Sequence, residues 1–256
     1  MNDSTPTHQI LTRQDGTSIA YNRLKGKSAG VVFLGGFMSD MTGSKAIALE
    51  MHCKKRGQAF LRFDYSGHGQ SSGTFSDGTI SKWTDDAIFA IEQLSDGPQV
   101  LVGSSMGGWI MLLVALRMNK NVAGLIGLAA APDFTENLIA HELNDKQRLA
   151  LQRDGFVLVP CDYDDKPYTI TQSLIDDGRN NLLLNKSISL NQPVRLIQGL
   201  KDKDVPWLTA LNLQEKLTSD DVEITLVKNG DHRLSGPNDI KRITKTLDLL
   251  LDGLPS

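Results

Sequence analysis

One stretch decides the fold of this chain: Gln99-Val100-Leu101-Val102-Gly103-Ser104-Ser105-Met106-Gly107-Gly108-Trp109. An apolar run that ends at Val102 meets the pattern Gly-x-Ser-x-Gly around Ser105, and an apolar helix-forming segment begins at Trp109. A strand, a sharp turn and a helix in this order are typical of a nucleophile elbow, which pushes a serine hydroxyl above the edge of a sheet. The flanking glycines leave room for a turn so tight that its central residue is strained. We therefore predict that Ser105 is a nucleophile rather than part of an ordinary turn.

Strand-like and helix-like segments alternate on both sides of this stretch. The strand-like runs cover residues 31–34, 58–64, 100–102, 122–131, 194–198 and 222–227, and the helix-like segments cover 44–56, 81–94, 109–116, 207–217 and 239–251. Short strands that alternate with helices predict an α/β fold with a mostly parallel sheet and helices on both faces. Asp15-Gly16, between two further strand-like runs, predicts an antiparallel hairpin at one edge.

The alternation lapses between residues 133 and 192. In this region we expect a helix over 135–153, a brief apolar piece over 156–160 and a helix over 169–179. A chain of 256 residues fits one domain with an insertion. We therefore predict an α/β core of residues 1–132 and 193–256, with residues 133–192 as a cap or lid over the active edge. The alternative is an irregular layer packed elsewhere.

The composition describes a water-soluble globular protein without a nucleic-acid footprint. The chain is 40% hydrophobic and 22% charged, with a net charge of −3 and a pI near 5.9. Such a balance argues against nucleic acid or an anionic membrane as a partner and favours a small molecule. The apolar runs are too short for stable membrane insertion. The oligomeric state cannot be predicted from these features.

Cysteine usage and the first residues bear on location. Cys53 and Cys161 lie far apart and form no C-x-x-C pair, so neither a disulfide framework nor a zinc site is indicated. Residues 1–6 are polar and lack the basic and apolar regions of a signal peptide. We therefore expect a reducing compartment and a cytoplasmic protein.

A serine nucleophile needs a base, and two of the five histidines follow strands. His232 follows the strand-like run 222–227, and His68 lies between two glycines after the run 58–64. Loops at the carboxyl ends of parallel strands share one edge of a sheet, so either histidine can approach Ser105. We predict His232 as the base and keep His68 as its rival.

The acid that orients the base should come from another loop at the same edge. Asp202 and Asp204 both follow the run 194–198; Asp202 has the spacing expected of an acid-bearing turn, and Asp204 could cap the next helix. We predict Asp202 as the acid. Asp64, at the end of its own strand, is expected to accept hydrogen bonds from backbone amides of its loop.

Two backbone N–H groups should hold the oxyanion that develops on a substrate carbonyl. Met106 opens the helix after Ser105, which directs its N–H toward that position. Gly35-Gly36 lets a second loop approach closely, which leaves the N–H of Phe37 as the opposite donor. The alternative is that these two glycines only turn the chain.

These residues carry a resemblance to a known family. The order Ser105, Asp202, His232 and the elbow around Ser105 resemble the α/β-hydrolase superfamily over nearly the whole chain. Residues 64–73 resemble its post-strand loop, and residues 36–46 are similar to the small acyl-protein thioesterase and acyl-glucuronide esterase branch and to related bacterial esterases. In one departure, Gly35-Gly36 stands where many members carry His-Gly before the oxyanion donor, so the support of that loop by a histidine is absent.

The residues and the resemblance together imply hydrolysis of carboxylic esters or thioesters through an acyl-enzyme on Ser105, with neither cofactor nor metal. A C–C bond hydrolase or a small peptidase could use the same three residues, because a fold does not determine the substrate. A hydrolase-fold binding protein without catalysis is a further alternative. A dinucleotide-binding oxidoreductase is disfavoured, since Ser72 occupies the place of the third fingerprint glycine.

Two groups of residues allow more than one interpretation. Trp207, Leu138, Leu143 and Phe156 could line an apolar acyl site, or they could serve only core and cap packing. An acidic cluster in the insertion matches no established calcium loop, so a solvated turn is favoured over a calcium site. The members of this cluster are Asp162, Asp164 and Asp165.

Overall fold

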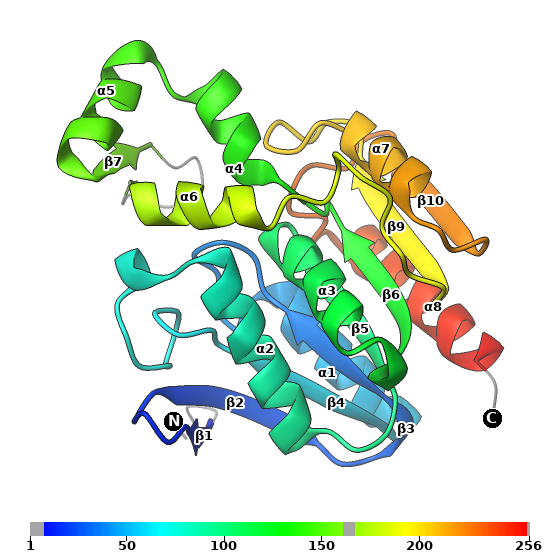
Figure 1. The fold of residues 1–256 in the computed structure, drawn as a ribbon. Coiled ribbons are helices and arrows are strands. Elements are labelled where there is room, and N and C mark those ends of the chain that lie inside the picture. Colours follow the sequence, from blue (N-terminus) through cyan, green and yellow to red (C-terminus); the bar gives the residue numbers. More distant parts are fainter. Residues whose placement is uncertain (1–7, 161–166, 255–256) are drawn as a thin grey trace, which may run out of the picture.

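A computed structural model describes residues 8–160 and 167–254. Their central feature is an eight-stranded sheet with the order β1-β2-β4-β3-β5-β6-β9-β10 (Figure 1). The strands are β1 (Gln9–Thr12), β2 (Ser18–Leu24), β3 (Lys27–Leu34), β4 (Gln58–Phe63), β5 (Gln99–Ser104), β6 (Val122–Leu128), β9 (Val194–Gly199) and β10 (Val222–Val227). Within this eight-stranded sheet only the pairs made by β2 are antiparallel, which confirms the predicted α/β-hydrolase architecture with an N-terminal edge hairpin.

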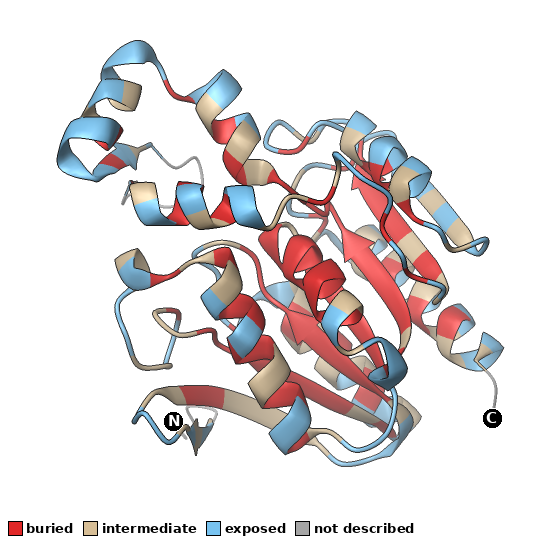
Figure 2. Ribbon diagram, viewed as in Figure 1, coloured by how far each residue is buried: buried red, intermediate tan, exposed pale blue. Residues whose placement is uncertain are grey.

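Helices cover both faces of this sheet, each over its own apolar cluster. The helices α1 (Ser44–Arg56) and α8 (Pro237–Gly253) pack on one face, and α2 (Ile80–Leu94), α3 (Met106–Arg117) and α7 (Leu208–Lys216) pack on the other. Two short 3₁₀ turns, η1 (Phe75–Asp77) and η2 (Asn119–Asn121), precede α2 and β6. Figure 2 shows that β5, β6 and α3 are buried along almost their whole length. The elbow therefore joins a strand and a helix that are almost entirely buried.

The ends of the helices follow local chemistry. At the start of α2, the side chain of Thr79 accepts a hydrogen bond from the backbone N–H of Lys82, so this helix begins one residue before the predicted Ser81. At the end of α1, Gly57 takes a left-handed conformation with φ of 69°. None of the described helices combines the length and the apolar character that crossing a membrane requires.

The segment between β6 and β9 forms a smaller layer with its own core. It contains α4 (Phe134–Asn137), the π-helix η3 (Leu138–Glu142), α5 (Asp145–Asp154), the antiparallel pair β7 (Phe156–Val159) and β8 (Tyr168–Thr171), and α6 (Gln172–Asn180). Figure 1 shows this layer above the edge of the sheet where β5 ends. The cysteine Cys161 and the acidic cluster of the sequence analysis lie outside the described residues.

Two helix predictions in this layer are wrong in their extent. The predicted helix over 135–153 is broken at Leu143, which is extended, and α5 restarts behind a capping box between Asn144 and Gln147. The predicted helix over 169–179 begins later, because its first residues belong to β8 and Thr171 caps α6. In both places a local capping side chain competes with helix continuation, and periodicity of apolar residues does not reveal that competition.

Candidate active site

The elbow around Ser105 is strained and tightly packed. Ser105 joins β5 to α3 with φ of 54° and ψ of −121°. A Cβ on Gly103 would lie 2.3 Å from the carbonyl oxygen of Gly107, and a Cβ on Gly107 would lie 2.1 Å from the carbonyl oxygen of Leu34. Both positions therefore require glycine. A strained residue that the surrounding structure holds in place is a feature of functional sites.

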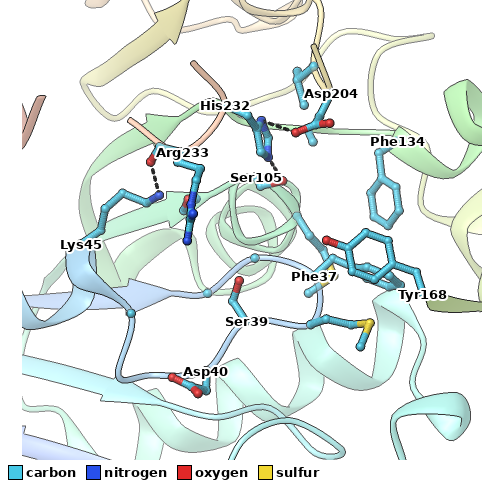
Figure 3. Close-up of a pocket in the computed structure, with 18 of the residues that line it drawn as sticks. Phe37, Ser39, Asp40, Lys45, Ser105, Phe134, Tyr168, Asp204, His232 and Arg233 are labelled. Atoms are coloured by element: carbon cyan, nitrogen blue, oxygen red, sulfur yellow. Dashed lines mark hydrogen bonds and ion pairs between the residues drawn. The ribbon is translucent and has the colours of Figure 1, made fainter. Parts of the chain in front are cut away.

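A hydrogen-bonded chain joins Ser105, His232 and Asp202. Figure 3 shows the part of it between Ser105 and His232, with Asp204 beside the imidazole. The Oγ atom of Ser105 lies 3.0 Å from Nε2 of His232, and Nδ1 of His232 lies 2.9 Å from Oδ2 of Asp202. The three residues come from the ends of β5, β9 and β10, whose carboxyl ends meet at one edge of the sheet. The fold thus brings the three predicted residues together, although 127 positions of sequence separate Ser105 from His232.

The carboxylate of Asp202 is held in place by further donors. It accepts hydrogen bonds from the backbone N–H of Asp204 at 2.9 Å, from that of Val205 at 2.8 Å and from the side chain of Gln198 at 2.9 Å. The side chain is fully buried, whereas that of Asp204 is 39% exposed and lies 3.9 Å from Nδ1 of His232. Asp202 is therefore oriented toward the imidazole, with Asp204 beside it at a longer distance.

Three side chains in this region also offer a geometry that could hold a metal ion. Ligand atoms of Asp202, Asp204 and His232 lie within 4.8 Å of one another. Two of these residues already bond to each other in the chain that leads to Ser105. A metal ion there would compete with that chain for the same atoms.

The rival histidine occupies a different environment. His68 is buried in a cluster of aromatic rings formed by Tyr65, Phe75 and Trp83, each with ring centres 5.1 to 5.5 Å from the imidazole. Burial lowers the pKa of His68 to about 4. Among the described residues its Nε2 atom has no hydrogen-bond partner. The structure thus places His68 in a packing role and not beside Ser105.

Asp64 behaves as an acceptor for its own loop. Its carboxylate accepts hydrogen bonds from the backbone N–H of Met41 at 2.6 Å and of Gln70 at 2.8 Å. Burial raises the pKa of this carboxyl group, and the two amide donors oppose that effect. The carboxylate therefore joins the loop after β3 to the loop after β4, as the sequence predicts.

The loop that carries Phe37 lies against the elbow. A Cβ on Gly36 would lie 3.4 Å from the Cβ of Ser105, so the backbone of this loop passes within van der Waals contact of the elbow. The ring of Phe37 makes edge-to-face contacts with Phe75, Phe134 and Tyr168, with centres 4.9 to 5.6 Å apart. Aromatic packing thus stabilises the loop in this chain, where a histidine would otherwise support it.

Ser105 opens into a cavity of about 560 Å³. Of the four residues predicted for an apolar acyl site, Leu138 lines this cavity. Leu143 instead packs inside the smaller layer. Phe156 and Trp207 are 48% and 39% exposed, because alternation along β7 turns Val157 rather than Phe156 inward and Trp207 stands just before α7.

Sequence reasoning missed several residues that line the cavity. Tyr168 and Ile170 come from β8, and the alternation Tyr-Thr-Ile-Thr over 168–171 is the signal that would have revealed this strand. Lys45 and Arg233 also line the cavity, from α1 and from the loop of His232. No sequence pattern brings these two together, since 188 positions separate them.

Comparisons with known proteins identify the family and the fold of this chain. A model of the alpha/beta hydrolase fold family matches residues 31–158. Palmitoyl-protein thioesterase ABHD10, mitochondrial, from Bos taurus is 40% identical over 96% of this chain and 80% of the relative. Among solved structures, a hydrolase from Agrobacterium vitis S4 has a TM-score of 0.91 and 38% identity, and mouse alpha/beta hydrolase domain-containing protein 10 has a TM-score of 0.89 and 38% identity. Both alignments cover 96% of this chain and 98% of the other.

The relatives also correct one prediction. The cytoplasmic location expected from the sequence is contradicted, because the names of the curated relatives from Bos taurus and Homo sapiens place those proteins in mitochondria. The observations behind that prediction do not distinguish the two locations. A polar surface and few cysteines suit any aqueous, reducing compartment.

The predicted activity class is supported over most of the chain. Relatives at about 40% identity are named as thioesterases, and they align with 96% of the residues. The prediction of an enzyme that hydrolyses carboxylic esters or thioesters is thereby confirmed. The fold of the chain, the family model that matches it and its relatives agree. The chain therefore belongs to the α/β-hydrolase family.

Proposed function

We propose that this protein is a thioesterase that removes acyl groups from cysteine sulfur, with Ser105 as nucleophile, His232 as general base and Asp202 as orienting acid. The observation that carries the proposal is the hydrogen-bonded chain of these three side chains, with heavy-atom distances of 3.0 and 2.9 Å. Both distances lie within the range over which a proton is transferred during catalysis. The names of the relatives suggest a long acyl chain such as palmitoyl.

The chemistry divides into two half-reactions. His232 takes the proton of Ser105 as the oxygen attacks the thioester carbonyl, and the same proton then passes to the leaving sulfur when the C–S bond breaks. Water next attacks the acyl-enzyme, His232 again removes a proton, and the acid product leaves with Ser105 restored. Asp202 holds the imidazole in the required tautomer and stabilises its cation.

The backbone N–H groups of Met106 and Phe37 are proposed to bind the oxyanion. Met106 is the first residue of α3, where N–H groups have no partner within the helix. The close approach of Gly36 to Ser105 supports a donor from the next residue, Phe37. Donors that are already in position need no reorganisation as charge develops on the substrate oxygen.

The layer between β6 and β9 is proposed to act as a cap, residues 133–192, that binds the acyl chain. Phe134, Leu138, Tyr168 and Ile170 all come from this layer, and all line the cavity that contains Ser105. Ligand cavities of this size are usually lined mainly by apolar and aromatic groups, with a few polar groups for orientation. An acyl chain would bury its surface against this wall.

Hydrolysis of an S-octanoyl cysteine derivative tests the assignment of Ser105. The variant Ser105→Ala is expected to lose about 10⁴-fold or more in turnover and to lose labelling by a fluorophosphonate probe. The matched control is Ser219→Ala, in the loop before β10 at the opposite edge of the sheet, which should retain both. Full turnover by Ser105→Ala would exclude the acyl-enzyme proposed here.

A further inference from the structure

The cavity around Ser105 has two chemically different walls. Figure 3 shows Phe37 and Tyr168 on one side of Ser105, and Lys45 and Arg233 on the other. An acyl chain suits the aromatic side, so the opposite side faces the part of the substrate that leaves. The ammonium group of Lys45 on that side predicts a leaving group of complementary charge.

Lys45 lies in the first turn of α1 and is half-buried at the cavity. Its ammonium group donates a hydrogen bond to the backbone carbonyl oxygen of Arg233. Among the described residues it makes no ion pair with a carboxylate, and Asp231 and Asp239 act on it only through longer-range electrostatics. Since an ammonium carries three donors, further donors are available to a ligand in the cavity.

The surroundings of Lys45 favour an anion. Burial lowers the pKa of Lys45 to about 8, and the nearby charge of Arg233 adds to this effect. The group is therefore charged at neutral pH but incompletely solvated. A carboxylate that approaches it gains a charge-assisted hydrogen bond and relieves the repulsion between the two cations.

Three acidic side chains also line the described part of the cavity, away from the ammonium group of Lys45. Asp204 lies beside His232, and burial together with the charge of Asp204 raises the pKa of Glu142. Asp40, which also lines the cavity, accepts hydrogen bonds from Thr42. An anionic group would be repelled from these acids and attracted to the ammonium group of Lys45.

We propose that Lys45 binds a carboxylate on the leaving group, so that the enzyme prefers S-acyl thiols carrying a free carboxylate. This inference rests on the proposed thioesterase function and assigns the leaving-group half of the same site. Lys45 acts here as a specificity-determining residue. Its hydrogen bond to the carbonyl of Arg233 keeps the ammonium next to the loop that carries His232.

The test compares two substrates that differ in one group: S-octanoyl-N-acetylcysteine, with a free carboxylate, and its neutral carboxamide, which imitates an internal cysteine. We expect the wild type to cleave the carboxylate substrate with a kcat/KM about tenfold higher, the size of one charge-assisted hydrogen bond. Lys45→Met should remove this preference by raising KM for the carboxylate substrate alone, and Lys45→Arg should retain most of it. The control Lys55→Met, at the far end of α1, should behave as wild type.

A second measurement does not depend on the folding of a variant. N-acetylcysteine, the carboxylate product, should inhibit the wild type competitively at about tenfold lower concentration than N-acetylcysteine amide. Equal inhibition by the two products, or equal kcat/KM for the two substrates, would show that the carboxylate is not recognised.

Two other results separate this inference from the function on which it rests. If Lys45→Met lowers kcat for both substrates equally, Lys45 only positions the loop of His232, and the specificity role is wrong. If the wild type cleaves neither substrate and a fluorophosphonate probe does not label Ser105, the proposed thioesterase function itself is wrong.

Discussion

Two loops at the same edge of the sheet each carry a histidine, and the two histidines have different surroundings. His68 follows β4 and is surrounded by aromatic rings, whereas His232 follows β10 and has a serine on one nitrogen and a carboxylate on the other. Burial lowers the pKa of His68 to about 4. A position after a parallel strand is therefore not enough to define a base; the groups opposite the two ring nitrogens decide what a histidine can do.

When each histidine is replaced by glutamine, the two variants should show the largest difference in turnover. His232→Gln is expected to reduce kcat by about 10⁴-fold or more, because no group then takes the proton of Ser105. His68→Gln should retain turnover within a few-fold per folded molecule, measured with a p-nitrophenyl ester and with the folded fraction determined by circular dichroism. The opposite ranking would transfer the role of base to His68.

Replacing the carboxylates beside His232 should cause the next largest change in kcat. Asp202→Asn should reduce kcat by about 10³- to 10⁴-fold, since the amide favours the wrong tautomer of the imidazole. Asp204→Asn is the matched control, at 3.9 Å instead of 2.9 Å from Nδ1, and it should lower kcat only a few-fold. Similar losses in both variants would mean that the two carboxylates share the orienting role.

The buried imidazole of His68 should make stability depend on pH. Its pKa is about 4 in the folded chain and about 6.5 when unfolded, so the unfolded chain binds more protons between these values. The free energy of unfolding should therefore fall as the pH drops from about 6.5 to 4, by about 3 kcal/mol from this group. Urea unfolding of the wild type and of His68→Phe checks this, because the variant should lack that part of the slope. An unchanged slope in His68→Phe would assign the pH dependence to other groups.

The smallest effect concerns the support of the loop that carries His68. The indole N–H of Trp83 donates a hydrogen bond to the carbonyl oxygen of Ser66 at 3.1 Å. Trp83→Phe should lower the free energy of unfolding by about 1 to 3 kcal/mol, because it removes this donor and some buried volume. Activity at saturating substrate should change less than twofold, since the loop is a packing element. A large loss of kcat without loss of stability would contradict that view.

Prediction from the sequence was most successful where the decisive contacts are local. The spacing of glycines around Ser105 and the alternation of strands and helices are short-range patterns, and the fold follows from them. The break at Leu143 and the strand β8 were missed, because capping side chains and a partner strand decide those boundaries. Phe156 and Trp207 were predicted to line the acyl site and instead face solvent, since hydrophobicity alone does not say which side of an element is inward.

The sequence by itself determined the elbow, the α/β alternation and a short set of side chains able to meet at one edge, because backbone sterics and hydrophobic periodicity act over a few residues. Only the tertiary structure decided that His68 packs among aromatic rings while His232 meets Ser105, and that Lys45 stands opposite an aromatic wall. These outcomes depend on loops from distant strands and helices that converge in space. Their mutual distances are set by the packing of the whole sheet and its covering helices.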